Sequence, residues 1–167
     1  MREGVADTQE RPQGRFSAPV EAKVPGGGYK RLYPLRSHPE QDRLRNSRAR
    51  FRVVPAGRRS GKTELAKRKL IVEALSAIGW PDPRYFAAAP TRDQAKAIYW
   101  NDLKAMVPRL LVADRSESNL ALTLRNGAEI CVVGMDRPER IEGRPWNGGV
   151  LDEYANMKPG AWGENVR

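Results

Sequence analysis

Residues 56–63 read AGRRSGKT, and their types and spacing are suited to binding a phosphate chain. They follow the pattern G-x-x-x-x-G-K-[ST], with alanine at the first glycine position. Gly61 would let backbone N–H groups curve around phosphate, and Lys62 would reach the β and γ phosphates. The hydroxyl of Thr63 would bind Mg²⁺. The segment therefore predicts a Walker A loop for ATP, whose nucleotide-binding residues are Gly57, Arg58, Arg59, Ser60, Gly61, Lys62 and Thr63.

Two neighbouring carboxylates could complete such a site. Residues 148–153 read GGVLDE, a short apolar run that ends in Asp152 and Glu153. At the end of a strand, Asp152 would hold Mg²⁺ directly or through water, and Glu153 would act as a general base on the attacking water. An acidic pair capping a helix is the alternative. Together with AGRRSGKT, the pair predicts a Walker B motif and a Mg²⁺-dependent ATPase in which Thr63 and Asp152 bind the metal.

Two arginines lie inside the predicted phosphate loop, where such loops ordinarily carry small or neutral residues. Positive charge facing a triphosphate stabilises the charge that develops during phosphoryl transfer. Arginines with this role raise rates by roughly 10³- to 10⁵-fold. One of the two could instead form a structural salt bridge, and the interpretation that we favour assigns the catalytic role to Arg58, beside Lys62 and Glu153.

The flanking segments alternate between strand and helix patterns. FRVVPA at 51–56 and RYFAAA at 84–89 are expected to be strands, and KTELAKRKLIVEALSAIG after residue 61 is expected to be a helix. The expected apolar stripe of that helix is Leu65, Ala66, Leu70, Val72, Leu75 and Ile78. Thr91 and Gln94 predict a capping box at the start of a second long helix. Its expected buried residues are Ala95, Ile98, Tyr99, Leu103 and Met106.

Residues 38–49 could form a short basic helix, and Asn126-Gly127 predicts a hairpin between ALTL at 121–124 and EICVV at 129–133. The order of these elements predicts an α/β fold of the P-loop NTPase class, ASCE/RecA-like. Its sheet is expected to be mostly parallel and flanked by helices, with the hairpin before the Walker B strand. Residues 1–32 are expected to be a flexible arm, or else a tether for DNA or a partner, and 33–167 an ATPase domain.

Composition narrows the possible partners and excludes several classes of site. Thirty Lys and Arg against 20 Asp and Glu give a formal net charge of +10, densest between 43 and 59. This favours a polyanionic partner, although solvated surface is the alternative. The chain has one cysteine, Cys131, and one histidine, His38. These counts exclude an intramolecular disulfide, a Cys-rich or His-rich zinc site and a secreted disulfide scaffold. The sequence has no run of 18 consecutive apolar residues, so it predicts no membrane-spanning helix.

Four segments together resemble phage terminase large subunits over about residues 38–165. They are HPEQ at 38–41, AGRRSGKT at 56–63, YFAAAPTRDQAKAIYW at 85–100 and GMDRPERIEGRPWNGGVLDEYANM at 134–157. The resemblance implies that Arg58 acts in cis and that Gln41 contacts adenine, with a solvated side chain as the alternative for Gln41. Related motors also use an arginine near 137–144 to reach a neighbouring subunit's nucleotide. Arg140 is our choice, and a solvated loop arginine is the alternative.

The resemblance further implies an ATP-driven motor that packages double-stranded DNA into a procapsid. The implied partners are the phosphate backbone of DNA, a portal protein, a small terminase subunit and further copies in a homo-oligomeric ring, with no membrane. The implied location is the cytoplasm of an infected bacterial host, transiently at the procapsid portal. The chain is expected to be truncated, without a nuclease domain. The alternatives are another P-loop translocase or helicase, or a DNA-binding assembly subunit that binds nucleotide without hydrolysing it. Trp146 and Trp162 are expected to pack against the core, with stacking on DNA as the alternative.

Overall fold

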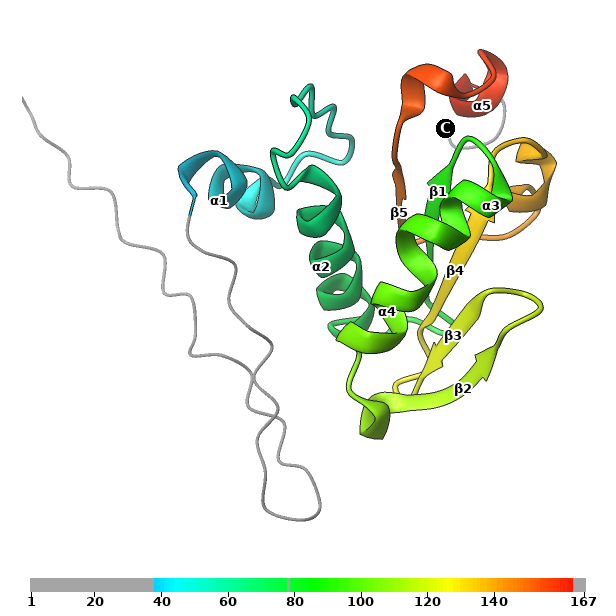
Figure 1. The fold of residues 1–167 in the computed structure, drawn as a ribbon. Coiled ribbons are helices and arrows are strands. Elements are labelled where there is room, and N and C mark those ends of the chain that lie inside the picture. The colour runs from blue at the N-terminus through cyan, green and yellow to red at the C-terminus, as the bar shows by residue number, and fades with distance from the viewer. Residues whose placement is uncertain (1–37, 78, 164–167) are drawn as a thin grey trace, which may run out of the picture. The chain divides into compact units, whose positions relative to one another are not determined.

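A computed structural model of the protein describes residues 38–77 and 79–163, with side chains as far as 161. Its centre is a five-stranded sheet in the order β2-β3-β4-β1-β5 (Figure 1). The strands are β1 (Arg84–Ala89), β2 (Val112–Ser116), β3 (Ala121–Leu124), β4 (Glu129–Gly134) and β5 (Gly148–Leu151). β1 pairs in parallel with β4 and β5, whereas β2, β3 and β4 pair antiparallel. The expectation of a mostly parallel sheet is therefore wrong, because the hairpin strands extend the same sheet and make it mixed.

The helices are α1 (Pro39–Asn46), α2 (Lys62–Leu75), α3 (Arg92–Ala95), α4 (Asn101–Met106) and α5 (Gly160–Gly163). A π-helical turn, Lys96–Trp100, joins α3 to α4 without a break. Three 3₁₀ turns complete the elements: Arg109–Leu111, Pro138–Ile141 and Tyr154–Asn156. Among residues 38–77 and 79–163, no helix combines the length and the apolar character needed to cross a bilayer.

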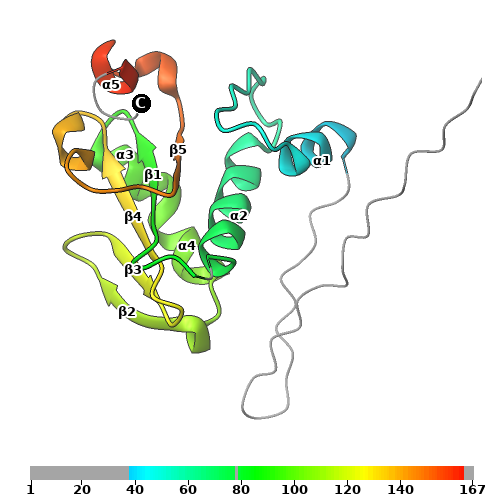
Figure 2. The ribbon, with the colours of Figure 1, turned by 180° about the vertical axis from the view of Figure 1, so that it is seen from behind.

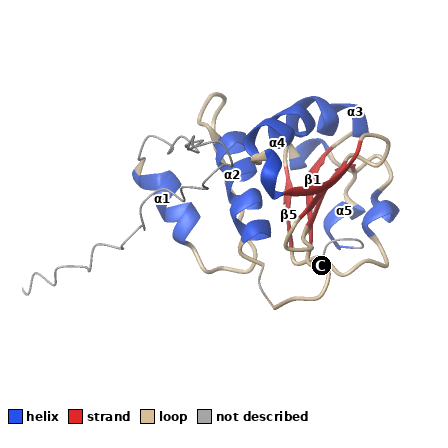
Figure 3. Cartoon of the chain, turned by 90° about the horizontal axis from the view of Figure 1, so that it is seen from below, coloured by secondary structure: helices blue, strands red, loops and turns tan. Residues whose placement is uncertain are grey.

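Helices cover one face of the sheet, and a second small apolar cluster covers the other. The side chains of β1 alternate between the two, as a strand's period of two requires. Tyr85, Ala87 and Ala89 join the larger cluster with residues of α2 and the α3–α4 helix. In Figure 3, α2 lies on the opposite side of β1 and β5 from α5. Phe86 and Ala88 join the smaller cluster with Met135, Ile141 and Ala161. The figure shows α5 on this second side.

Several local expectations are confirmed. β1 has the expected bounds. The Thr91 hydroxyl accepts a hydrogen bond from the Gln94 backbone N–H, and the Gln94 side-chain oxygen accepts one from the Thr91 backbone N–H, which completes the capping box. β3 and β4 form the expected hairpin, with Gly127 at a φ of 87° in its turn. The Asn126 side-chain amide donates to the carbonyl of Ala74 at 2.8 Å, which ties the hairpin turn to the end of α2.

The expected strand at 51–56 is wrong. These residues form no strand, and Phe51, Val53 and Val54 are exposed, Val53 by 92%. A short apolar run does not by itself specify a strand, and Pro55 has no N–H to donate to a ladder. Within the described residues β5 therefore pairs only with β1, and α2 runs alongside these two strands (Figure 2).

The apolar stripe of α2 also differs from the expected one at a single described position. Val72 is 57% exposed, whereas its neighbour Ile71 is buried with Leu70 and Ala74. Successive helical residues are rotated by about 100°, so Ile71 and Val72 cannot both face the sheet. Lys67, which the sequence presents as one more surface lysine, is buried on the same face as Leu70.

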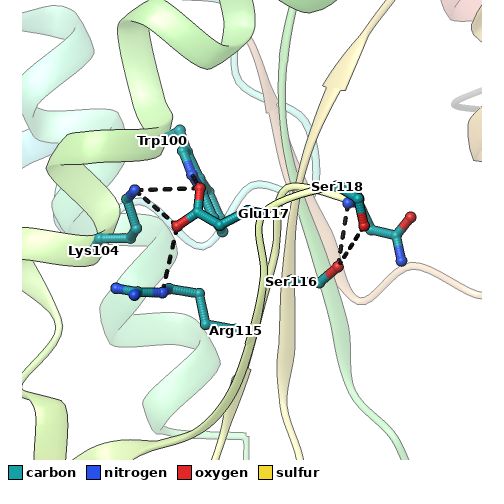
Figure 4. A network of polar contacts seen from close by, with 7 residues as sticks. Trp100, Lys104, Arg115, Ser116, Glu117 and Ser118 are labelled. Carbon is teal, nitrogen blue, oxygen red and sulfur yellow. Dashed lines mark hydrogen bonds and ion pairs between the residues drawn. The ribbon is translucent and has the colours of Figure 1, made fainter.

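The strand β2 was not expected from the sequence, because its residues VADRS carry charge and lack an apolar alternation. A polar network fixes the turn that follows it (Figure 4). Glu117 accepts hydrogen bonds from the Trp100 indole N–H at 2.6 Å and from the Lys104 ammonium at 3.1 Å. These hydrogen bonds connect the turn to the π-helical turn and α4, and so hold the hairpin edge of the sheet against the helical layer.

Candidate functional site

The loop before α2 forms a tight turn and leads directly into the first residue of the helix. The Ser60 backbone N–H donates to the Gly57 carbonyl at 3.4 Å, which closes a tight turn, and Arg59 and Gly61 both have positive φ, 63° and 77°. Gly61 is the N-cap of α2, and no side chain caps the helix. The unpaired N–H groups of a helix's first turn attract anions. The N-terminus of α2 is therefore open to an anion at Lys62 and Thr63.

Gln41 lies against this loop. Its side-chain amide donates to the Ser60 carbonyl at 3.1 Å, and a Cβ at Gly61 would lie 3.0 Å from the same nitrogen. Glycine therefore satisfies both the left-handed backbone and the close approach of Gln41 at this point. The structure thus places Gln41 beside the loop, whereas contact with an adenine remains a prediction.

The two predicted carboxylates lie at the start of α2. Asp152 continues the pairing of β5, because its N–H donates to the Ala88 carbonyl at 2.9 Å. Its Oδ2 accepts a hydrogen bond from the Thr63 hydroxyl at 2.8 Å. The next residue, Glu153, has a left-handed backbone, and its Oε1 lies 3.4 Å from the Nζ of Lys62. The fold therefore brings together four residues that lie in two segments far apart in the sequence.

Asp152 is a buried carboxylate held by neutral donors. It is 8% exposed, and besides the Thr63 hydroxyl it accepts hydrogen bonds from the Tyr99 hydroxyl to Oδ2 at 3.2 Å and from the Glu153 backbone N–H to Oδ1 at 3.1 Å. Burial and the charge of Asp152 raise the pKa of Tyr99 far above its ordinary value, so its hydroxyl keeps its proton and acts as the donor. Within the described residues no basic side chain pairs with Asp152.

The donor set around Asp152 fits one kind of metal site. Buried carboxylates in proteins are paired with cations or coordinate metals. Among the described residues no three His, Cys, Asp or Glu side chains gather as a metal cluster. A hydroxyl and a single carboxylate fit Mg²⁺, which keeps several waters and binds one or two carboxylates together with substrate phosphates. Thr63 and Asp152 therefore suit Mg²⁺ delivered with a nucleotide.

The predicted arginines Arg58, Arg59 and Arg140 all have exposed side chains. Arg58 and Arg59 have exposed side chains in the loop and form no ion pair within the part of the chain that the structure describes. Arg140 is exposed in the 3₁₀ turn that follows β4. No ion pair or side-chain hydrogen bond joins it to Thr63, Asp152 or Glu153 within the described residues. The catalytic roles of Arg58 and Arg140 therefore stay predictions.

Trp146 packs as expected from its type, whereas the side chain of Trp162 lies outside the described residues. The Trp146 ring meets Phe86 edge-on with centroids 5.3 Å apart, and its indole N–H donates to the Ile141 carbonyl at 2.7 Å.

Tyr99 is the residue that sequence reasoning missed. The apolar periodicity identified it as a core residue, and only the position of β5 reveals that its hydroxyl reaches Asp152.

Comparison with known proteins agrees with this arrangement. No family model matches the chain, and no curated protein matches it. Two solved structures do: the large terminase ATPase domain of Thermus phage P74-26 and a mutant of the same domain, each with a TM-score of 0.68 and 26% sequence identity. Each match covers 81% of this chain and 60% of the matched chain. The chain therefore has a mixed α/β structure similar to a phage large terminase ATPase domain, which confirms the resemblance predicted from its motifs.

Proposed function

We propose that this chain is the ATP-binding and ATP-hydrolysing motor domain of a phage terminase large subunit. The observation that carries the proposal is the meeting of two segments, in which Thr63 lies 2.8 Å from Asp152 and Lys62 lies 3.4 Å from Glu153. A phosphate loop and a strand-end carboxylate pair must lie this close to act on one magnesium triphosphate.

Each side chain has a distinct task in the proposed reaction. The N-terminus of α2 and Lys62 bind the β and γ phosphates, and Arg58 stabilises the charge that develops on them. Thr63 and Asp152 hold Mg²⁺, which supplies charge neutralisation at the phosphates. Glu153 orients the attacking water and accepts its proton. The ATP substrate is in contact with Gln41 at its base, and Arg140 serves the nucleotide of a neighbouring copy.

The pair of Lys62 and Glu153 must separate before both can act. Lys62 is needed on phosphate and Glu153 on water, yet the two lie within ion-pair distance of each other. Their side chains are 30% and 52% exposed, and ion pairs in contact with solvent contribute only about 0–1 kcal/mol. Exchange of Glu153 for phosphate as the partner of Lys62 therefore costs little.

The wider setting belongs to the same proposal. The chain, with residues 33–167 as its ATPase domain, would work in a homo-oligomeric ring with a portal protein and a small terminase subunit. It would act in the cytoplasm of the infected host and at the procapsid portal, and would move double-stranded DNA into the procapsid. The net charge of +10 suits contacts to DNA phosphates. Such binding weakens steeply as salt rises, because it releases condensed counterions.

The first experiment replaces Lys62 with alanine and measures ATP binding in MgCl₂ by calorimetry. Affinity should fall steeply, because Lys62→Ala removes the side chain assigned to the phosphates. Lys69→Ala is the matched control, since Lys69 lies on the same helix and pairs with Glu73. Equal affinity in folded wild-type and Lys62→Ala proteins would refute the assignment of this loop to phosphate.

The second experiment separates binding from turnover. Glu153→Gln should still bind Mg²⁺-ATP but lose roughly 10²- to 10⁴-fold in phosphate release, the contribution of a positioned general base. Glu139→Gln, at an exposed position on the 3₁₀ turn after β4, is the control. Phosphate release is measured with and without double-stranded DNA. A wild-type protein that binds ATP and releases no phosphate in either condition would instead be a nucleotide-binding assembly subunit.

A further inference from the structure

One buried contact of the candidate site involves a residue that the motifs do not include. The Tyr99 hydroxyl donates to Asp152 Oδ2 at 3.2 Å, and Tyr99 is completely buried. The same oxygen accepts from Thr63, while Oδ1 accepts from the Glu153 backbone N–H. Both carboxylate oxygens are thus held, and the plane of the carboxylate is defined by donors from α2, the end of β5 and the π-helical turn.

The local fold fixes the Tyr99 ring. Tyr99 lies in the π-helical turn Lys96–Trp100, where one extra residue is accommodated in the helix, and such turns are frequent at functional sites. The turn presents Tyr99 to Asp152 and the next residue, Trp100, to Glu117. The ammonium of Lys67 lies 5.7 Å from the centroid of the Tyr99 ring and is itself paired with Asp102. The hydroxyl therefore has little freedom to leave Asp152.

Tyr99 differs from Thr63 as a partner of Asp152. The Thr63 hydroxyl is assigned to Mg²⁺ in the proposed function, so it does not serve as a permanent donor to the carboxylate. Within the described residues the Tyr99 hydroxyl bonds to Asp152 alone, and it approaches from the interior of the core. A fixed outer donor of this kind orients a metal-binding carboxylate.

We propose that Tyr99 is a positioning residue that orients the Asp152 carboxylate for a divalent cation bound with nucleotide. The inference rests on the proposed function, because it assigns the cation to Thr63 and Asp152. Loss of the Tyr99 hydroxyl should therefore raise the concentration of cation needed for nucleotide binding. The contacts of Lys62 and the α2 N-terminus with phosphate should stay unchanged.

The test is a titration of MgCl₂ at fixed ATP concentration, in which nucleotide binding is measured by calorimetry and by the rise in melting temperature. Tyr99→Phe should raise the Mg²⁺ concentration for half-maximal binding by roughly 10- to 100-fold, the usual effect of removing an outer partner of a metal ligand. ATP affinity in EDTA should not change. Tyr85→Phe is the matched control, since Tyr85 is a buried tyrosine on β1 that takes no part in the hydrogen bonds of Asp152.

The readouts distinguish positioning from a structural role and from failure of the proposed function. Each variant is compared with its own melting temperature without nucleotide, so that a change in folding stability does not count. The inference is overturned if Tyr99→Phe and wild type need the same Mg²⁺ concentration, or if affinity falls equally with Mg²⁺ and in EDTA. If wild type itself shows no Mg²⁺-dependent ATP binding, the proposed function fails instead, and the inference falls with it.

Discussion

Lys67 places a positive charge inside the protein, and its single ion-pair partner among the described residues is Asp102. The Lys67 side chain is 9% exposed, whereas that of Asp102 is 55% exposed. Removal of one partner of a fully buried pair costs about 3–5 kcal/mol, and an exposed pair contributes about 0–1 kcal/mol. Because water screens Asp102, we expect Asp102→Asn to lower the free energy of unfolding by an intermediate amount, about 2 kcal/mol. For a chain of this size that lowers the melting temperature by about 4–8 °C.

The assay is thermal unfolding followed by circular dichroism, with a double-mutant cycle. Lys67→Met keeps the length of the side chain and removes the buried charge, so it should recover most of the loss when added to Asp102→Asn. Asp114→Asn, at an exposed position on β2, controls for the change of charge alone. Equal melting temperatures for Asp102→Asn and Asp114→Asn, or no coupling between the two substitutions of the pair, would refute the reasoning.

Three further predictions concern residues outside the candidate site. The hydrogen bond from Trp100 lowers the pKa of Glu117 below its ordinary value. The ionised Glu117 therefore adds to the free energy of unfolding above its unfolded-state pKa, and this contribution is lost as pH falls through its folded-state pKa. Urea unfolding should therefore separate wild type from Glu117→Gln at neutral pH, and equal separation in strong acid would contradict this. Burial raises the pKa of the Cys131 thiol to about 12, so a thiol reagent at pH 8 should modify it only at the rate of unfolding. Gly149→Ala should cost about 1–3 kcal/mol in chemical denaturation, because the new Cβ would lie 2.3 Å from the Phe86 ring; an unchanged midpoint would show that the ring moves freely.

Local chemistry explains which parts of the fold could be predicted from the sequence. The capping box at Thr91 and the turn at Gly127 depend on residues close together in the chain, and both are confirmed. The strands that were predicted wrongly or missed depend on pairing with other parts of the chain. An apolar run at 51–56 becomes a strand only if another strand pairs with it, and a polar run such as β2 becomes one because β3 does.

The candidate site divides in the same way. The motif spacing identifies Lys62, Thr63, Asp152 and Glu153, and the fold brings these four together. The sequence could not reveal Tyr99, since a tyrosine on an apolar stripe is ordinarily a core residue. Its contact depends on the register of a helix against the end of β5, which is set by packing across the whole sheet.

The helix α2 joins two distant parts of the molecule through one continuous backbone. Its 14 residues span about 21 Å. At one end stand the groups that face the candidate site, and at the other the Ala74 carbonyl accepts a hydrogen bond from Asn126 in the hairpin turn. Backbone hydrogen bonds run along the whole helix, so its two ends belong to one continuous element. The loop at Gly61 and the turn of the β3–β4 hairpin are thus connected through α2, although they lie more than 60 residues apart in the sequence.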